Sequence, residues 1–499
     1  MFDGLLLFGQ SIVRFGTPET IAYALLASLV GVVMGALPGL TATMALALMT
    51  TLTLKLPPSQ ALLILICTYV GSIYGGSRSA ILLNIPGTPA SAAACLDGYA
   101  LARQGMAGRA MGLATTGSVM GTLIGMFFLA AFTPILGGLA LKFGAYEFFW
   151  LALFGVIIAG TLTGDDPLKG WIAGIAGLFV ATIGQEPQYG FERFAWGVRD
   201  LAGGIQLVPA LVGAFGFAEL LTAMRRRQLP VKISALDRVI PKLRDVTQYW
   251  RTILRSGLIG TGVGIVPGVG EDVAAWSSYA AAKRASKEKE KYGKGSVEGL
   301  MAAETGDNAC VPGAMIPVLT LAIPGSAPAA VLMAAMIIHG VKPGPLIMVE
   351  NPQFVYDVVA MMLFATIGIL IYGLLLTKAL VQVLRVPQHL IVPIIFVLCA
   401  VGSFAIAGRL FDVYVMLAFG LIGFFLRHFG YPMAPLVLGI VLGDLMEKNL
   451  RRALILSDGD LSPFFTRPIA GTVAAMIFAT IAWKLWSLYR RPVKREVEA

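Results

Sequence analysis

The chain contains little charge. Only 13% of its 499 residues are Asp, Glu, Lys or Arg, about half the share of a typical soluble domain. Hydrophobic residues make up 57%, and several nearly uncharged runs reach ~17 residues, the length that crosses a bilayer core. These runs are 124–141, 148–164, 354–376, 390–407 and 469–485. The sequence therefore predicts an all-α polytopic membrane protein with about 10–12 spanning or half-spanning segments.

Several other features are scarce or absent. The four cysteines occur singly without a CxxC pair, and the three histidines are scattered. We therefore expect no disulfide, no His-based metal site and no cofactor. The motif GxxxxGK[ST] is missing, which excludes ATP hydrolysis through a P-loop, and neither HExxH nor GxSxG indicates an enzyme. No basic cluster precedes the first apolar run, so no removable signal peptide is expected.

The net charge of +10 does not indicate nucleic-acid binding. The basic residues collect in loops and near the C-terminus, which is the positive-inside pattern of a membrane protein. The expected surroundings are membrane lipid, with no nucleic acid as a partner.

Three short motifs occur twice, in the same order and about 230 residues apart. The pairs are GALPGL (35–40) and GIVPGV (264–269), LLNIPGT (82–88) and TLAIPGS (320–326), and LVPALVG (207–213) and MAPLVLG (433–439). The chain is therefore predicted to be a duplicated unit, with repeat 1 at residues 1–233 and repeat 2 at 234–499.

The distribution of Lys and Arg predicts that the repeats have opposite orientations. The segment 224–255, before GIVPGV, holds nine Lys or Arg against two Asp, whereas the first eighteen residues hold only Arg14. Inverted-topology repeats of this kind occur in many secondary transporters. One basic cluster, KNLRR at 448–452, would fall on the outer side under strict inversion.

The spacing of the basic stretches also predicts re-entrant hairpins. Only 27 residues, 256–282, separate the stretch ending at Arg255 from the one beginning at Lys283. Two full crossings need about 40 residues, so the segment is expected to turn at a tip and leave on the side it entered. The predicted tip is Pro267–Gly268, and its counterpart in repeat 1 is Pro38–Gly39.

Both IPG motifs interrupt apolar segments, which predicts broken helices near 84–89 and 322–328. A break exposes N–H groups that bind anions and carbonyls that hold Na⁺. A proline kink that only shapes packing is the alternative, but duplication beside Asn, Thr and Ser favours function. The predicted substrate-binding residues are Pro38, Gly39, Thr41, Arg78, Asn84, Pro86, Gly87, Thr88, Pro267, Gly268, Pro324, Gly325 and Ser326.

Charged residues near these breaks have two interpretations each. Arg78 is suited to pairing with a substrate carboxylate or to snorkelling. Glu271 and Asp272 follow the second tip and form either a cation or proton site or a solvated pair. For acids at 304 and 307, helix capping is the first interpretation and ion binding the second. The predicted cation-binding residues are Glu271, Asp272 and Asn308.

The motifs GALPGLTATMALAL, YGGSRSAILLNIPGTPASAAACLDGYALARQG, MIPVLTLAIPGS and LGDLMEKNLRRALILSDGDLSPFFTRPI span residues 35–469. The chain resembles the large transmembrane subunit of the tripartite tricarboxylate transporters, the TctA family. It departs from the family pattern at Gly306 and Pro312, in ETGDNACVPGA, where such proteins usually have an alanine-rich stretch and a double glycine.

The resemblance implies a multi-pass protein of inverted repeats in the bacterial inner membrane. It also implies a small TctB-type membrane subunit and a periplasmic TctC-type solute-binding protein that delivers substrate. Expected substrates are citrate-like tricarboxylates, dicarboxylates and other organic acids, taken up by symport with a cation, Na⁺ in the best-known cases, with H⁺ as the alternative.

Two other functions fit parts of the sequence. Duplicated half-helices also build pores, so a channel-like or binding-protein-independent organic anion permease is the nearer alternative. An intramembrane aspartyl protease is the remote one, based on Asp357 in VYDVV and Asp444 in VLGDL. The second aspartate lacks the expected preceding glycine, since Val441 stands there, and the protease reading does not explain the duplication.

Overall fold

The computed structural model describes residues 2–37, 39–164, 166–186, 189–225, 237–384, 386 and 388–489. Pro38, a predicted tip residue, and the predicted repeat boundary at residues 233 and 234 lie outside the described residues.

The first half is helical up to a short hairpin. Its elements are α1 (Phe2–Phe15), α2 (Pro18–Ala36), α3 (Ala42–Leu52), α4 (Pro58–Leu83), η1 (Pro89–Ser91), α5 (Ala92–Ala94), η2 (Cys95–Tyr99), α6 (Ala100–Arg103), α7 (Ala107–Ala140), α8 (Ala145–Leu162) and α9 (Pro167–Ala181). After these come β1 (Gly184–Gln185), β2 (Glu192–Arg193), α10 (Arg199–Ala202), α11 (Leu207–Leu211), η3 (Val212–Phe217) and α12 (Ala218–Arg225).

The described part of the second half is also helical. It contains α13 (Leu243–Thr247), α14 (Trp250–Ile265), α15 (Gly270–Ala285), η4 (Lys289–Lys291), α16 (Val297–Leu321), α17 (Ala327–Ile338), α18 (Ile347–Glu350), α19 (Gln353–Leu374) and α20 (Thr377–Val383). The last elements are α21 (Gln388–Ala407), α22 (Leu410–His428), α23 (Met433–Leu456), α24 (Pro463–Thr466) and α25 (Pro468–Tyr489).

The prediction of an all-α polytopic membrane protein is confirmed. Within the described residues, nine helices are long and apolar enough to cross a membrane. The five apolar runs noted in the sequence fall on α7, α8, α19, α21 and α25. Shorter apolar helices accompany the nine, among them α3, α9 and α17.

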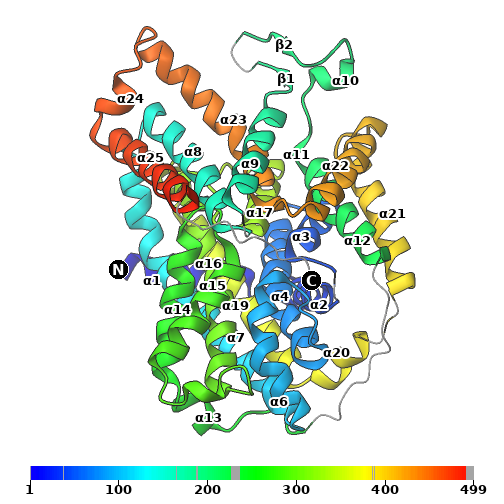
Figure 1. Ribbon diagram of the computed structural model, residues 1–499. Helices are drawn as coiled ribbons and strands as arrows, with labels where there is room; N and C mark the ends of the chain where they lie inside the picture. Colours follow the sequence, from blue (N-terminus) through cyan, green and yellow to red (C-terminus); the bar gives the residue numbers. More distant parts are fainter. Residues whose placement is uncertain are drawn as a thin grey trace.

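Two helices form the buried centre of the molecule. Every residue from 61 to 82 in α4 and from 299 to 320 in α16 is buried. α4 packs against α2, while α16 packs most extensively against α7 and α14 (Figure 1). Glycines allow these close approaches, because a Cβ on Gly31 of α2 or Gly260 of α14 would collide with the backbone of the facing helix.

The capping role expected for the acids of α16 is wrong. Ser296 is the N-cap, and its hydroxyl accepts a hydrogen bond from the Gly299 N–H at 3.0 Å. Glu304 and Asp307 lie two to three turns inside the helix. The helix continues through Gly306 and Pro312 because neighbouring helices pack tightly around it and override the weak local propensity.

A small hairpin extends from one end of the bundle, opposite α6 and α13 (Figure 1). β1 and β2 pair antiparallel, with Gly184 opposite Arg193. The Arg193 guanidinium donates two hydrogen bonds to the Glu447 carboxylate, at 2.5 and 3.0 Å. This bidentate ion pair attaches the hairpin to α23.

Candidate functional site: a cavity at the helix breaks

The helix before each IPG motif ends in the same way. α4 ends at Leu83, and Asn84 takes a left-handed conformation with φ of 57°. α16 ends at Leu321, and Ala322 has φ of 56°. Asn tolerates this region, whereas Ala rarely adopts it. After each break the backbone is extended at Thr88 or Ser326, and the next helical segment then begins.

A glycine fixes each break against the helix that precedes the tip. A Cβ on Gly87 would overlap the carbonyl oxygen of Gly35, and a Cβ on Gly325 would overlap that of Gly264. Gly35 and Gly264 are themselves paired in the repeated GALPGL and GIVPGV motifs. The same close backbone contact therefore occurs once in each half of the chain.

The predicted tips are turns between helices. α2 and α3 are joined through Gly39 at φ of 95°, and α14 and α15 through Gly268 at φ of 75°. Thr41 caps α3 by accepting a hydrogen bond from the Met44 N–H at 3.2 Å. The Gly268 N–H donates to the Pro324 carbonyl at 3.3 Å, which joins the second tip to the second break.

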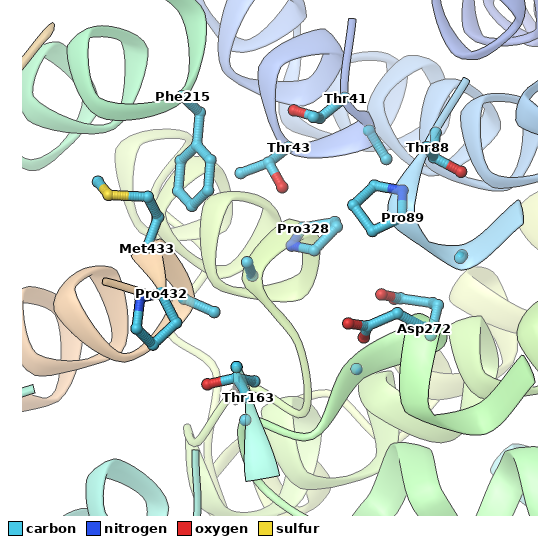
Figure 2. Close-up of a pocket in the computed structure, with 18 of the residues that line it drawn as sticks. Thr41, Thr43, Thr88, Pro89, Thr163, Phe215, Asp272, Pro328, Pro432 and Met433 are labelled. Atoms are coloured by element: carbon cyan, nitrogen blue, oxygen red, sulfur yellow. The ribbon is translucent and has the colours of Figure 1, made fainter. Parts of the chain in front are cut away.

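A cavity of ≈ 450 Å³ lies where the tips and breaks meet (Figure 2). Its volume is in the range of pockets that hold a small metabolite. It is lined by Thr41, Ala42, Thr43, Ile73, Thr88, Pro89, Ala90, Thr163, Gly164, Phe215, Glu219, Gly268, Val269, Gly270, Glu271, Asp272, Ala327, Pro328, Arg427, Gly430, Tyr431, Pro432, Met433 and Ala434.

Four helices begin at the wall of this cavity. The first-turn residues Ala42 of α3, Gly270 of α15, Ala327 of α17 and Met433 of α23 all line it. The first N–H groups of a helix have no intrahelical acceptor, and the helix dipole places partial positive charge there. Four such ends around one cavity create a region that favours an anion.

Charged side chains of both signs also reach the cavity. Asp272 and Glu271 come from α15, and Arg427 of α22 pairs with Glu219 of α12. Glu271 is buried and accepts hydrogen bonds from the hydroxyls of Tyr69 and Ser326, the latter at 2.8 Å.

The structure brings together part of the predicted substrate set. Thr41, Thr88 and Gly268 line the cavity, and Thr88 Oγ1 is a buried hydroxyl oxygen with no hydrogen-bond partner among the described residues. Ser326 does not line the cavity, but its hydroxyl donates a hydrogen bond to the carboxylate of Glu271, which does. The other predicted residues that do not line the cavity are Gly39, Arg78, Asn84, Pro86, Gly87, Pro267, Pro324 and Gly325.

The predicted cation-binding residues separate into two places. Glu271 and Asp272 are at the cavity, whereas Asn308 lies in a buried polar cluster between α4, α7 and α16. Arg78 is also deeply buried, with its guanidinium 4.4 Å from the Tyr74 ring and donating to the Met111 carbonyl at 3.3 Å.

Sequence reasoning did not select several residues of the cavity wall. Thr43 is two positions from a predicted residue, and Phe215, Glu219 and Arg427 come from distant helices. The sequence around Arg427 carried no strong signal, because an arginine in the last turn of an apolar helix usually reaches the membrane interface without a partner. Its ion pair with Glu219 is visible only in the structure.

The fold and site define a multi-pass membrane protein with a metabolite-sized cavity at paired helix breaks. The profile of the tripartite tricarboxylate transporter TctA family matches residues 21–438. The chain belongs to this family and is therefore a membrane component of a tripartite tricarboxylate transporter. The family consists of transporter components that work with TctB and TctC partners.

Two curated relatives come from Agrobacterium vitis. An uncharacterized 52.8 kDa protein in the TAR-I ttuC′ 3′ region is 35% identical over 466 residues, covering 93% of each chain. An uncharacterized protein in the TAR-II ttuC′ 3′ region is 35% identical over 217 residues, which is 44% of this chain and 90% of the relative. No solved structure matches the chain significantly.

Proposed function

We propose that this protein is the carrier subunit for cation-coupled uptake of organic acids, with the cavity at the helix breaks as the substrate site. Di- and tricarboxylates are the substrate class, and Na⁺ is the coupling ion. A TctC-type periplasmic protein delivers the substrate, and a TctB-type subunit completes the complex in the bacterial inner membrane.

The observation that carries this proposal is the set of four helix N-termini at one cavity. α3 comes from the first half of the chain and α15, α17 and α23 from the second. Their N–H groups suit carboxylate oxygens, and the hydroxyls of Thr41, Thr43 and Thr88 offer further hydrogen bonds. Neutral donors of this kind bind a carboxylate without holding it permanently.

The acids at the cavity support a requirement for a cation. An incoming di- or tricarboxylate would approach Glu271 and Asp272, and like charges repel strongly where water is scarce. A cation that binds with the substrate offsets this repulsion. Coupling of the two binding events is what a symporter needs.

The paired breaks support two inverted repeats that work by alternating access. The conformations at Asn84 and Ala322 and the contacts of Gly87 and Gly325 recur between the halves. Their surroundings differ, since Pro86 is exposed and Pro324 is buried. Equivalent segments in unequal environments are expected when one repeat is open and the other is closed.

Helix length supports a re-entrant second hairpin. α14 and α15 have 16 residues each, or about 24 Å, and a bilayer core is about 30 Å thick. The first hairpin is less regular, because α2 has 19 residues and α3 only 11.

The basic cluster at 448–452 is the feature that disagrees with strict inversion. Lys448 pairs with Asp444 at 2.7 Å, and Arg451 pairs with Glu447 at 2.9 Å and with Glu186 at 3.0 Å. These ion pairs do not remove the disagreement, because the positive-inside rule depends on Lys and Arg and not on net charge.

Uptake into proteoliposomes tests the proposal. The protein is reconstituted with its small subunit, and labelled di- and tricarboxylates are supplied with the cognate binding protein, in Na⁺ or in choline. We expect accumulation of at least one acid that needs both the binding protein and an inward Na⁺ gradient.

Counterflow distinguishes a carrier from a channel in the same vesicles. Preloading with unlabelled substrate should accelerate entry of the labelled acid. Conductance without the binding protein, and with no counterflow, would contradict the carrier function.

A further inference from the structure

The polar cluster between α4, α7 and α16 is buried away from the cavity. Ser77 of α4 donates to both carboxylate oxygens of Glu304 at 2.6 Å, and Ser118 of α7 donates to one of them at 3.0 Å. The Asn308 amide donates to Ser118 Oγ at 3.0 Å and to Asp307 Oδ1 at 2.7 Å. Hydrogen bonds thus connect three helices around two carboxylates.

Two oxygens of this cluster lack a partner. Asp307 Oδ2 and Asn308 Oδ1 accept no hydrogen bond from any described residue, although both side chains are at most 1% exposed. Buried acceptors are almost always satisfied, and a lone buried carboxylate oxygen is especially costly. Two neighbouring orphan oxygens therefore indicate a ligand that accepts electron pairs.

With both carboxyl groups ionised, the formal charges of the cluster do not balance. Among the described residues it has the carboxyl groups of Glu304 and Asp307 and one guanidinium, that of Arg78, whose Nε and Nη2 also lack a hydrogen-bond partner. An unpaired buried ion is expensive, so both carboxyl groups are expected to be ionised only when a cation is bound. A single monovalent cation would then make the cluster neutral.

We propose that Glu304, Asp307 and Asn308 of α16, together with Ser118 of α7, form a binding site for Na⁺. All of its ligand atoms are oxygens, from carboxylates, an amide and a hydroxyl, which are the donors that hard cations prefer. A proton on Asp307 is the competing ligand, because it would give the carboxyl one donor for a neighbouring oxygen. Saturable binding of Na⁺ distinguishes the two.

The site is connected to the cavity through the packing of two helices. α16, which carries Asp307, packs against α15, which carries Glu271. Glu271 lines the cavity and accepts a hydrogen bond from Ser326 at the second break. A cation at Asp307 would weaken the negative potential at Glu271 and so favour an anion in the cavity. The role of this site in transport rests on the proposed function, but its affinity for Na⁺ does not.

Direct binding of ²²Na⁺ tests the site without substrate or binding protein. The full chain is placed in nanodiscs, and binding is measured by scintillation proximity against unlabelled Na⁺ and K⁺. Wild-type protein should bind Na⁺ saturably, and Asp307→Asn should lower the affinity about tenfold or more. Asn308→Ala should have the same effect, which guards against failure of one variant to fold.

Asp412→Asn is the matched control. Asp412 is another fully buried aspartate, paired with Arg409 at 3.0 Å on α22, outside the cluster. The Asp412→Asn variant should bind Na⁺ with the affinity of the wild-type protein. Wild-type affinity in well-folded Asp307→Asn and Asn308→Ala, or no saturable binding by wild-type protein, overturns the site. Loss of Na⁺ binding in these variants while wild-type protein transports no organic acid would refute only the proposed function.

Discussion

The Tyr279 hydroxyl donates a hydrogen bond to Asp97 Oδ2 at 2.9 Å, joining residues 182 positions apart. The other carboxylate oxygen of Asp97 accepts from the backbone N–H groups of Gly293, Gly295 and Ser296 at 2.8 to 2.9 Å. Asp97 is fully buried and belongs to the DGY sequence of η2. One side chain therefore holds the segment after the first break against the loop that leads into α16.

Replacing Asp97 with Ala should destabilise the protein by about 2 kcal/mol or more, because three backbone N–H groups, that of buried Ser296 among them, lose their acceptor. Asp97→Asn keeps one acceptor oxygen and should be milder. Thermal unfolding followed by fluorescence-detected size exclusion would measure both. Equal stability of Asp97→Ala and wild type would show that this contact contributes little.

The glycine contacts at the breaks should not tolerate a methyl group. Gly87→Ala and Gly325→Ala would each force backbone atoms apart, so we expect low yields of folded protein and little uptake. Gly262 of α14 is the control, since its Cβ would meet no atom within 4 Å. Gly262→Ala should be stable, with a gain of up to about 1 kcal/mol from helix propensity. Expression levels and size-exclusion elution profiles would show which of the three variants fold, and normal profiles for Gly87→Ala and Gly325→Ala would contradict the prediction.

Thr88→Ala should weaken uptake without changing the fold. The Thr88 hydroxyl oxygen is buried beside the cavity without a partner among the described residues, and loss of one hydrogen bond to a carboxylate corresponds to about tenfold in affinity. Thr88→Ser should retain most activity. Thr366→Ala is the control, because that hydroxyl donates to its own helix at Met362. Equal KM values for Thr88→Ala and wild type would remove this residue from the site.

Arg427 should contribute to attracting the anionic substrate. Arg427→Ala removes the cation at the cavity and leaves Glu219 unpaired, so KM should rise about tenfold to a hundredfold. Arg427→Lys should recover part of this loss. Because partly exposed charges are screened, the difference between variants should shrink at high ionic strength. A KM that is unchanged in Arg427→Ala at low salt would contradict this role.

Most of the helices could be predicted because apolar length is a strong signal in a membrane protein. The interruptions were also visible, since Pro and Gly occur within the apolar segments at 35–40, 82–88 and their repeats. The region around Glu304 was misjudged as the start of a helix. Its Gly, Asp, Asn and Pro are weak helix formers, and only the packing of α7, α14 and α15 around α16 explains why the helix continues.

The cavity could be predicted only in part. Thr41, Thr88 and Gly268 belong to motifs that break a helix, so their sequence surroundings mark them. Glu219 and Arg427 are 208 positions apart and meet only through the packing of α12 on α22. Such a pairing depends on tertiary structure, and a single sequence contains no measure of it.

The four helix ends at the cavity come from both halves of the chain, so the anion site that we propose would exist only while those halves keep their present arrangement. If α15, α17 and α23 moved as a body away from α3, the ligand would lose donors and its residence time would shorten. Occupancy of the cavity thus reports on the relative position of the two halves. A bound carboxylate would therefore hold the two halves together, and its release would allow them to separate.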